Sequence, residues 1–155
     1  HLTTRRQRQM CIRDSLKNKN VNFIKDYDPS IPDVNTNKEQ LIQALINLVR
    51  NSIQALEFKG NITIRTRTEP SYTIGNDYYP LVTKISVIDN GPGIPEDKLK
   101  EIFYPMVSTK TGGMGLGLTI AQSIIMQNSG LIECSSKQRE TSFTIVLPVR
   151  SKSDA

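Results

Sequence analysis

Three groups of residues in this chain have side chains and spacing suited to nucleotide chemistry. The first is Asp89, which follows a strand-like run and precedes Asn-Gly-Pro-Gly at residues 90–93. A carboxylate at the end of a strand can accept a hydrogen bond from an adenine amino group, and Gly91 and Gly93 let the backbone approach the ring closely. Taken alone, the same sequence is also simply a good turn.

The second group is the glycine-rich stretch Gly-Gly-Met-Gly-Leu-Gly-Leu at residues 112–118, which leads into an apolar helical segment. Backbone N–H groups at a helix N-terminus form an anion site, so this stretch can wrap a polyphosphate. It is not a P-loop, because no Gly-Lys-Ser/Thr follows the glycines, and its spacing differs from the dinucleotide-binding fingerprint. A flexible loop is the alternative explanation.

The third group is an amide stripe formed by Gln43, Asn47 and Asn51, which recur every four residues and therefore share one face of a predicted helix. For this helix alone, a polar solvent face is the simpler explanation. Beside a phosphate-binding loop, however, an Asn carbonyl can supply an oxygen ligand to Mg²⁺. Together the three groups indicate binding of ATP with Mg²⁺.

The order of predicted elements indicates an α+β fold. A capping box at residues 36–39 opens a helix that runs to about residue 56, a short helix spans 95–103, and an apolar helix at 116–127 is stopped by Gly130. Gly60-Asn61 is expected to be a turn and residues 70–80 a polar loop. Strands are expected at 21–27, 62–65, 81–88, 131–135 and 142–147. We therefore expect a two-layer α/β sandwich with a mixed, mostly antiparallel sheet covered on one face by helices.

The bulk composition agrees with one globular domain. The 155 residues are 37% hydrophobic, and no apolar run approaches the roughly 18 residues of a membrane span. Cys11 and Cys134 are isolated, so neither a zinc site nor a disulfide is indicated, and a cytoplasmic setting is expected. The net charge of +5 lies partly in arginines near the N-terminus without interleaved aromatic residues, so we expect no direct nucleic-acid binding.

In combination, the motifs resemble the ATP-binding domain shared by bacterial sensor histidine kinases, gyrase, Hsp90 and MutL, the GHKL family. Residues 47–51 match its asparagine box, 89–93 its first glycine box and 113–118 its second, while 102–105 look like the phenylalanine box of the kinases. The resemblance runs from about Val21 to Arg150. It implies the Bergerat fold, with a mobile lid at residues 96–114.

A finer resemblance is to the nitrogen-regulation subfamily of these kinases. It is carried by residues 25–32, 64–68 and 103–108 and by the insert around residues 72–79, whereas the lid segment at 108–111 is less characteristic of that subfamily. We accordingly expect residues 1–15 to be a tail or non-native segment, 16–150 a histidine-kinase catalytic ATP-binding domain, and 151–155 a C-terminal tail.

Carried over position by position, the resemblance implies roles for single residues. Asn51 is the expected Mg²⁺ ligand and Asp89 the adenine-binding carboxylate, with Thr141 supporting the adenine site. The expected catalytic residues near the phosphates are Asn47, Arg50 and Lys110. The other expected nucleotide contacts are Gln54, Gly91, Gly93, Ile94, Gly113, Gly115, Leu116 and Gly117.

The ATPases of this superfamily typically carry a Glu four residues before the metal-binding Asn. Here that residue is Asn47, whose amide cannot act as a general base. The resemblance therefore implies a kinase that transfers the ATP γ-phosphoryl group to a histidine on a dimerisation domain of the same protein, for relay to a response regulator. We expect this domain to lie outside the present chain, whose only histidine is His1, and the full-length protein to be a homodimer. The alternatives are an ATP-switched module that stimulates a partner's phosphatase activity, and a GHKL ATPase.

Overall fold

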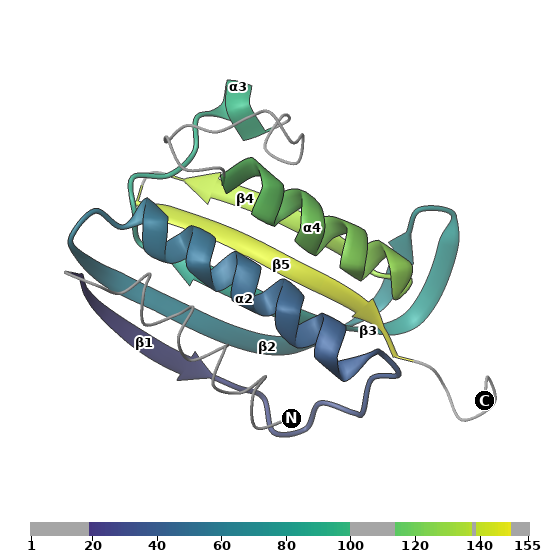
Figure 1. Ribbon diagram of the computed structural model, residues 1–155. Coiled ribbons are helices and arrows are strands. Elements are labelled where there is room, and N and C mark those ends of the chain that lie inside the picture. The colour runs from purple at the N-terminus through teal and green to yellow at the C-terminus, as the bar shows by residue number, and fades with distance from the viewer. Residues whose placement is uncertain (1–18, 100–113, 138, 150–155) are drawn as a thin grey trace.

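The computed structural model describes residues 19–99, 114–137 and 139–149. The described elements are β1 (Asn20–Asp26), α2 (Lys38–Ala55), β2 (Lys59–Ile74), β3 (Asp77–Asp89), α3 (Glu96–Leu99), α4 (Met114–Gln127), β4 (Leu131–Lys137) and β5 (Glu140–Pro148). The strands form one sheet in the order β1-β2-β3-β5-β4, in which β1 and β2 are parallel and the other neighbouring pairs antiparallel. Helices α2 and α4 lie side by side on one face (Figure 1). The predicted two-layer α+β sandwich is confirmed.

The hydrophobic core lies between the sheet and the two long helices. Strand side chains alternate between the two faces of a sheet, so every second residue of each central strand points toward the helices. The core residues with at most 1% exposure are Ala44, Leu48, Ile53, Ile62, Val87, Ala121, Ile125, Phe143, Ile145 and Leu147. Burial of each large side chain stabilises the fold by about 1.5–3 kcal/mol. The core therefore holds α2 and α4 against one face of the sheet.

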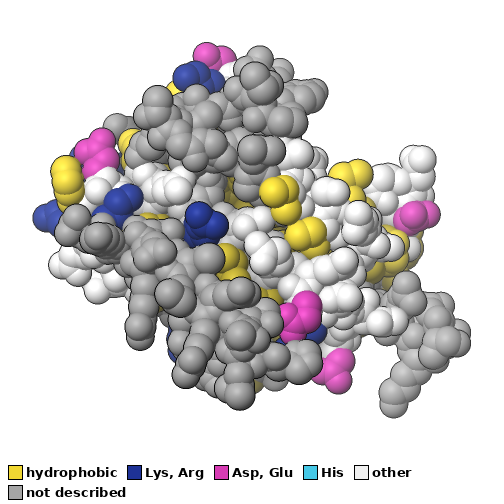
Figure 2. Space-filling model, viewed as in Figure 1, with side chains coloured by type: hydrophobic (Ala, Val, Ile, Leu, Met, Phe, Trp, Pro, Cys, Tyr) yellow, Lys and Arg dark blue, Asp and Glu magenta, His cyan; other side chains and the backbone are white. Residues whose placement is uncertain are grey.

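Apolar residues also lie on the outer surface of α4. Exposed hydrophobic side chains appear over this helix in Figure 2, and its exposed large hydrophobic residues are Ile120 and Met126. The apolar sequence of α4 thus exceeds what the core alone can bury. None of the helices in the described part of the chain is long and apolar enough to cross a membrane.

Helix α2 begins one residue later than the predicted capping box requires. Its N-cap is Asn37, whose side chain accepts a hydrogen bond from the Gln40 N–H at 3.1 Å. Thr36 instead donates its hydroxyl to Asn128 Oδ1 at 2.9 Å, and Asn128 Nδ2 donates to Gln40 Oε1 at 3.0 Å and to the Ile124 carbonyl at 2.8 Å. A side chain from the end of α4 therefore competes with the local cap, which sequence spacing does not reveal.

The hairpin of β2 and β3 is much longer than expected. Gly60 and Asn61, predicted as a turn, lie inside β2, and most of the predicted loop at 70–80 is paired strand with a tight turn at Gly75-Asn76. Cross-strand pairs such as Tyr72 with Tyr79 stabilise this polar segment, which alternation alone does not identify.

The ends of α4 also differ from the prediction. The helix begins at Met114, so Gly115 and Gly117 lie in its first turn rather than before it. At the other end Ser129, with φ 64°, adopts the left-handed conformation, while the Gly130 N–H donates to the Ile125 carbonyl at 2.9 Å. A Cβ at Gly130 would lie 2.4 Å from the Val146 carbonyl oxygen. Glycine is needed there for close packing rather than for a left-handed φ.

Candidate nucleotide-binding site

The strand register brings polar side chains into one row at an end of the sheet. Asp89, the last residue of β3, pairs with Ile62 on one side and with Thr141 on the other, and Thr141 pairs with Ser136 of β4. Ile62 is fully buried, so the row faces the helices. Three strands thus place a carboxylate and two hydroxyls next to one another on the covered face.

Asp89 is the only acidic residue among the buried polar residues of the described chain, with 2% exposure. Its Oδ1 accepts the Gly91 N–H at 3.0 Å, whereas its buried Oδ2 has no hydrogen-bond partner among the described residues. Burial raises the pKa of Asp89, and the Gly91 N–H and the nearby Ser52 hydroxyl act in the opposite direction. An unpartnered buried carboxylate oxygen is costly, so this atom is suited to an N–H donor from a ligand.

Hydrogen bonds hold both ends of the turn after Asp89. Asn90 Oδ1 accepts the Asn61 N–H at 2.8 Å, and the Ile94 N–H donates to Ser136 Oγ at 2.7 Å. Ser136 and Asn90 were not among the predicted site residues. A serine at an inward-facing position near the end of β4 is a polar residue on a face that is otherwise apolar, and this could have indicated a site.

The turn itself requires both of its glycines. A Cβ at Gly91 would lie 2.9 Å from Asp89 Oδ1, and Gly93 has φ +87° with the Lys137 carbonyl oxygen 2.7 Å from its virtual Cβ. The turn therefore needs glycine at both positions even without a ligand. Contact of Gly91 and Gly93 with a purine stays a prediction.

The amide stripe of α2 lies as predicted along one side of the helix. Gln43 Nε2 donates to Asn47 Oδ1 at 3.2 Å, and one turn later Asn51 Oδ1 is buried without a hydrogen-bond partner in the described chain. Arg50 is exposed and Gln54 is half-buried. No cluster of three His, Cys, Asp or Glu side chains suited to a metal occurs among the described residues. The Asn51 carbonyl oxygen therefore offers a hard cation one ligand, and phosphate oxygens would have to supply others.

The remaining predicted residues are distributed around this site. Thr141 is 3% exposed and stands in the row with Asp89, and Ile94 packs against the core. Leu116 lies between Gly115 and Gly117 in the first turn of α4, where helix N–H groups lack intrahelical partners. Lys110, Gly113 and most of the predicted lid lie outside the described residues.

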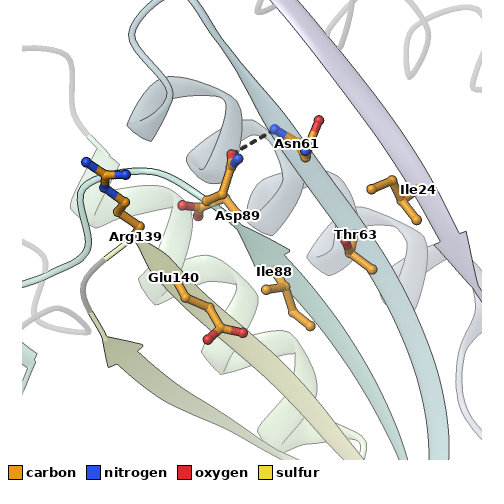
Figure 3. A pocket seen from close by; sticks show the side chains of 8 residues that line it. Ile24, Asn61, Thr63, Ile88, Asp89, Arg139 and Glu140 are labelled. Atoms are coloured by element: carbon orange, nitrogen blue, oxygen red, sulfur yellow. Dashed lines mark hydrogen bonds between the residues drawn. The ribbon is translucent and has the colours of Figure 1, made fainter.

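A hollow of about 330 Å³ lies on the other side of Asp89 (Figure 3). Thr63 and Ile88 belong to the alternate set of strand positions that faces away from the helices. The hollow is lined by Ile24, Asn61, Thr63, Ile88, Asp89, Asn90, Arg139 and Glu140. The hollow therefore opens on the face of the sheet without helices, whereas the row of Asp89, Thr141 and Ser136 faces the helices.

Similarity to known proteins covers most of this chain. Residues 36–151 match the model of the family described as histidine kinase-, DNA gyrase B-, and HSP90-like ATPase. The chain belongs to this family. It is also 48% identical over 132 residues to the sensory histidine kinase/phosphatase NtrB of Salmonella typhimurium and 44% identical over 127 residues to that of Vibrio alginolyticus. These matches cover 84% and 81% of this chain but only 38% and 36% of the relatives.

The same fold occurs in solved structures of histidine kinases. The catalytic domain of the histidine kinase ThkA superposes with a TM-score of 0.71 at 31% identity, covering 94% of this chain and 90% of that one. The GHKL fold expected from the motifs is thereby confirmed.

Proposed function

We propose that this chain is the ATP-binding catalytic domain of a sensor histidine kinase of the nitrogen-regulation type. The observation that carries the proposal is a pair of buried oxygens without partners in the described chain, Asp89 Oδ2 and Asn51 Oδ1. The first suits the amino group of adenine, and the second suits Mg²⁺. The NtrB relatives, named as sensory histidine kinases/phosphatases, support the choice of subfamily.

The residues present fit a magnesium-nucleotide complex. Asn51 would hold Mg²⁺ together with phosphate oxygens, and Asn47, Arg50 and Gln54 lie on the same helix within one or two turns of it. When bound, the ion neutralises phosphate charge during phosphoryl transfer. The role of the protein is then to hold adenine against Asp89 and to position the phosphates near the start of α4.

A kinase fits this site better than an ATPase. The only acidic residue of α2 is Glu39, in the first turn of the helix. At the position where an ATPase carries a base, Asn47 has an amide whose oxygen already accepts a hydrogen bond from Gln43. An amide has no useful proton affinity and cannot activate water. The nucleophile would therefore come from elsewhere, and we assign it to a histidine on a dimerisation domain, with a response regulator as the next acceptor.

The experiment uses ATP labelled in the γ-phosphate. The chain is incubated with and without a separately produced histidine-bearing dimerisation domain of the Salmonella typhimurium relative. We expect label on that histidine, and hydrolysis by the chain alone far below a typical enzyme rate of about 10 s⁻¹. Asp89→Ala should abolish most transfer, and Asp77→Ala, at the exposed tip of the β2–β3 hairpin, should not.

Two other outcomes would contradict the kinase assignment. Phosphate release near 10 s⁻¹ without an acceptor domain would indicate an ATPase. ATP binding without transfer, combined with faster dephosphorylation of a phosphorylated response regulator, would indicate a phosphatase-stimulating module. The second alternative is suggested by the word phosphatase in the name of the relatives.

A further inference from the structure

Ser136 makes hydrogen bonds that connect two walls of the candidate adenine site. Its Oγ accepts the Ile94 N–H at 2.7 Å and lies 3.2 Å from Thr141 Oγ1. Ile94 belongs to the turn after Asp89, and Thr141 stands directly opposite Asp89 in the strand register. One hydroxyl therefore touches both the turn and the neighbour of the carboxylate.

Chemistry fixes the direction of the hydrogen bond between Ser136 and Ile94. A backbone N–H can only donate, so Ser136 Oγ is the acceptor toward Ile94. The hydroxyl proton of Ser136 has two acceptors within reach, Thr141 Oγ1 at 3.2 Å and the Glu140 carbonyl oxygen at 3.4 Å, and either hydroxyl can be the donor in the Ser136–Thr141 pair. When Ser136 donates to Thr141, the proton of Thr141 is free to be donated onward.

We propose that Ser136 is a positioning residue that makes the Thr141 hydroxyl a donor and thereby sets the preference for a 6-aminopurine. This inference rests on the proposed function. Asp89 Oδ2 offers an acceptor, and Thr141 offers a donor one strand away, where directly opposed Cβ atoms are about 4.5–5.5 Å apart. Adenine presents the complementary pair, an amino donor beside a ring-nitrogen acceptor. A 6-oxopurine presents the reverse pair.

The test is direct binding of ADP and inosine diphosphate to the 155-residue chain by calorimetry. The two nucleotides have the same ribose and the same two phosphates, so a difference in their affinities reports on the base alone. We expect the wild-type chain to prefer ADP, and Ser136→Ala to lower both ADP affinity and the ADP-to-inosine-diphosphate preference about three- to tenfold. Ser136→Thr keeps the hydroxyl and should restore the preference. Ser136→Cys keeps the shape with a weak donor and should behave like Ser136→Ala.

Ser135→Ala is the matched control, because Ser135 is the exposed neighbour on the opposite face of β4. A double-mutant cycle on the base preference distinguishes this role from a general loosening of the turn. Once Thr141→Val has removed the second hydroxyl, Ser136→Ala should change the base preference no further.

The outcomes separate this inference from the proposed function. If the wild-type chain binds neither nucleotide, the proposed function fails. If the wild-type chain prefers ADP and the preference is unchanged in Ser136→Ala or Ser136→Cys, the inference is overturned, even where both affinities fall equally. Equal loss for both nucleotides would show that Ser136 only supports the turn.

Discussion

At the scale of single residues, Asp89 combines a stability cost with its proposed role in binding adenine. Its carboxylate is buried near Ser52 of α2, and only one of its oxygens has a partner in the described chain, the Gly91 N–H. Burial raises its pKa above the ordinary value of 3.8. A buried charge of this kind is costly to the nucleotide-free fold, and a ligand donor removes much of the cost.

Asp89→Asn should therefore separate stability from binding. Because the folded pKa is raised, the contribution of Asp89 to stability is largest below pH 3.8 and is lost as pH rises through the folded pKa. Asn has no charge and keeps an acceptor for Gly91. The nucleotide-free variant should have a higher thermal midpoint than wild type at pH 7, with the difference shrinking toward acid pH.

Thermal melts across the pH range and ADP titrations measure the two effects. ADP affinity should fall about ten- to hundredfold or more, as expected for a lost hydrogen bond to a charged group. A midpoint difference that does not vary with pH would show that burial of the charge is not the cause.

At the scale of elements, Asn128 holds the two long helices in register. From the end of α4 it accepts hydrogen bonds from Thr36 Oγ1 at 2.9 Å and the Asn37 N–H at 3.2 Å, and it donates to Gln40 Oε1 at 3.0 Å. These hydrogen bonds connect the start of α2 with the end of α4.

Asn128→Ala should lower the free energy of unfolding by about 1–3 kcal/mol, since several partly buried groups lose partners at once. For a chain of this size the thermal midpoint should fall by roughly 2–4 °C per kcal/mol. Gln127→Ala removes an exposed amide from the preceding position and is the control. Indistinguishable midpoints for the two variants would show that the α2–α4 connection is held by apolar packing alone.

At the scale of the whole molecule, the two faces of the sheet are used differently. One face carries the helices and the candidate site. On the other, the β2–β3 hairpin bends near Ser71, whose φ is 56° and which lies opposite Pro80, a residue without an N–H. Beyond the bend, the Tyr72 hydroxyl bonds to Glu133 of β4, and Lys84 lies over the Tyr72 ring, 4.7 Å from its centroid. The hairpin therefore lies across the open face at the end of the sheet away from Asp89.

Tyr72→Phe should lower the free energy of unfolding by about 1 kcal/mol without changing ADP affinity. The hydroxyl partner of the half-buried Glu133 is lost, while the row of Asp89, Thr141 and Ser136 is untouched. Tyr78→Phe removes an exposed hydrogen bond to Ser71 Oγ at 3.1 Å, should have a smaller effect, and is the control. Weaker ADP binding in Tyr72→Phe would mean that the two ends of the sheet are coupled.

Local pattern in the sequence was sufficient for the fold class and for the position of Asp89. Helical spacing in α2, the strand leading into Asp89 and the Asp-Asn-Gly-Pro-Gly turn are all local signals, because each depends on residues within a few positions. The amide stripe at Gln43, Asn47 and Asn51 follows from helix geometry alone.

Only the tertiary structure decided which oxygens lack partners and which distant residues hold the site together. Ser136 meets Ile94 across 42 positions, and Asn128 meets Thr36 across 92. These contacts depend on strand register and on the packing of α4 against α2, which no local pattern encodes. The same holds for the long β2–β3 hairpin, whose polar sequence is ordered by pairing with the opposite strand. The sequence by itself indicated the chemistry expected of the candidate site, and long-range packing determined its geometry.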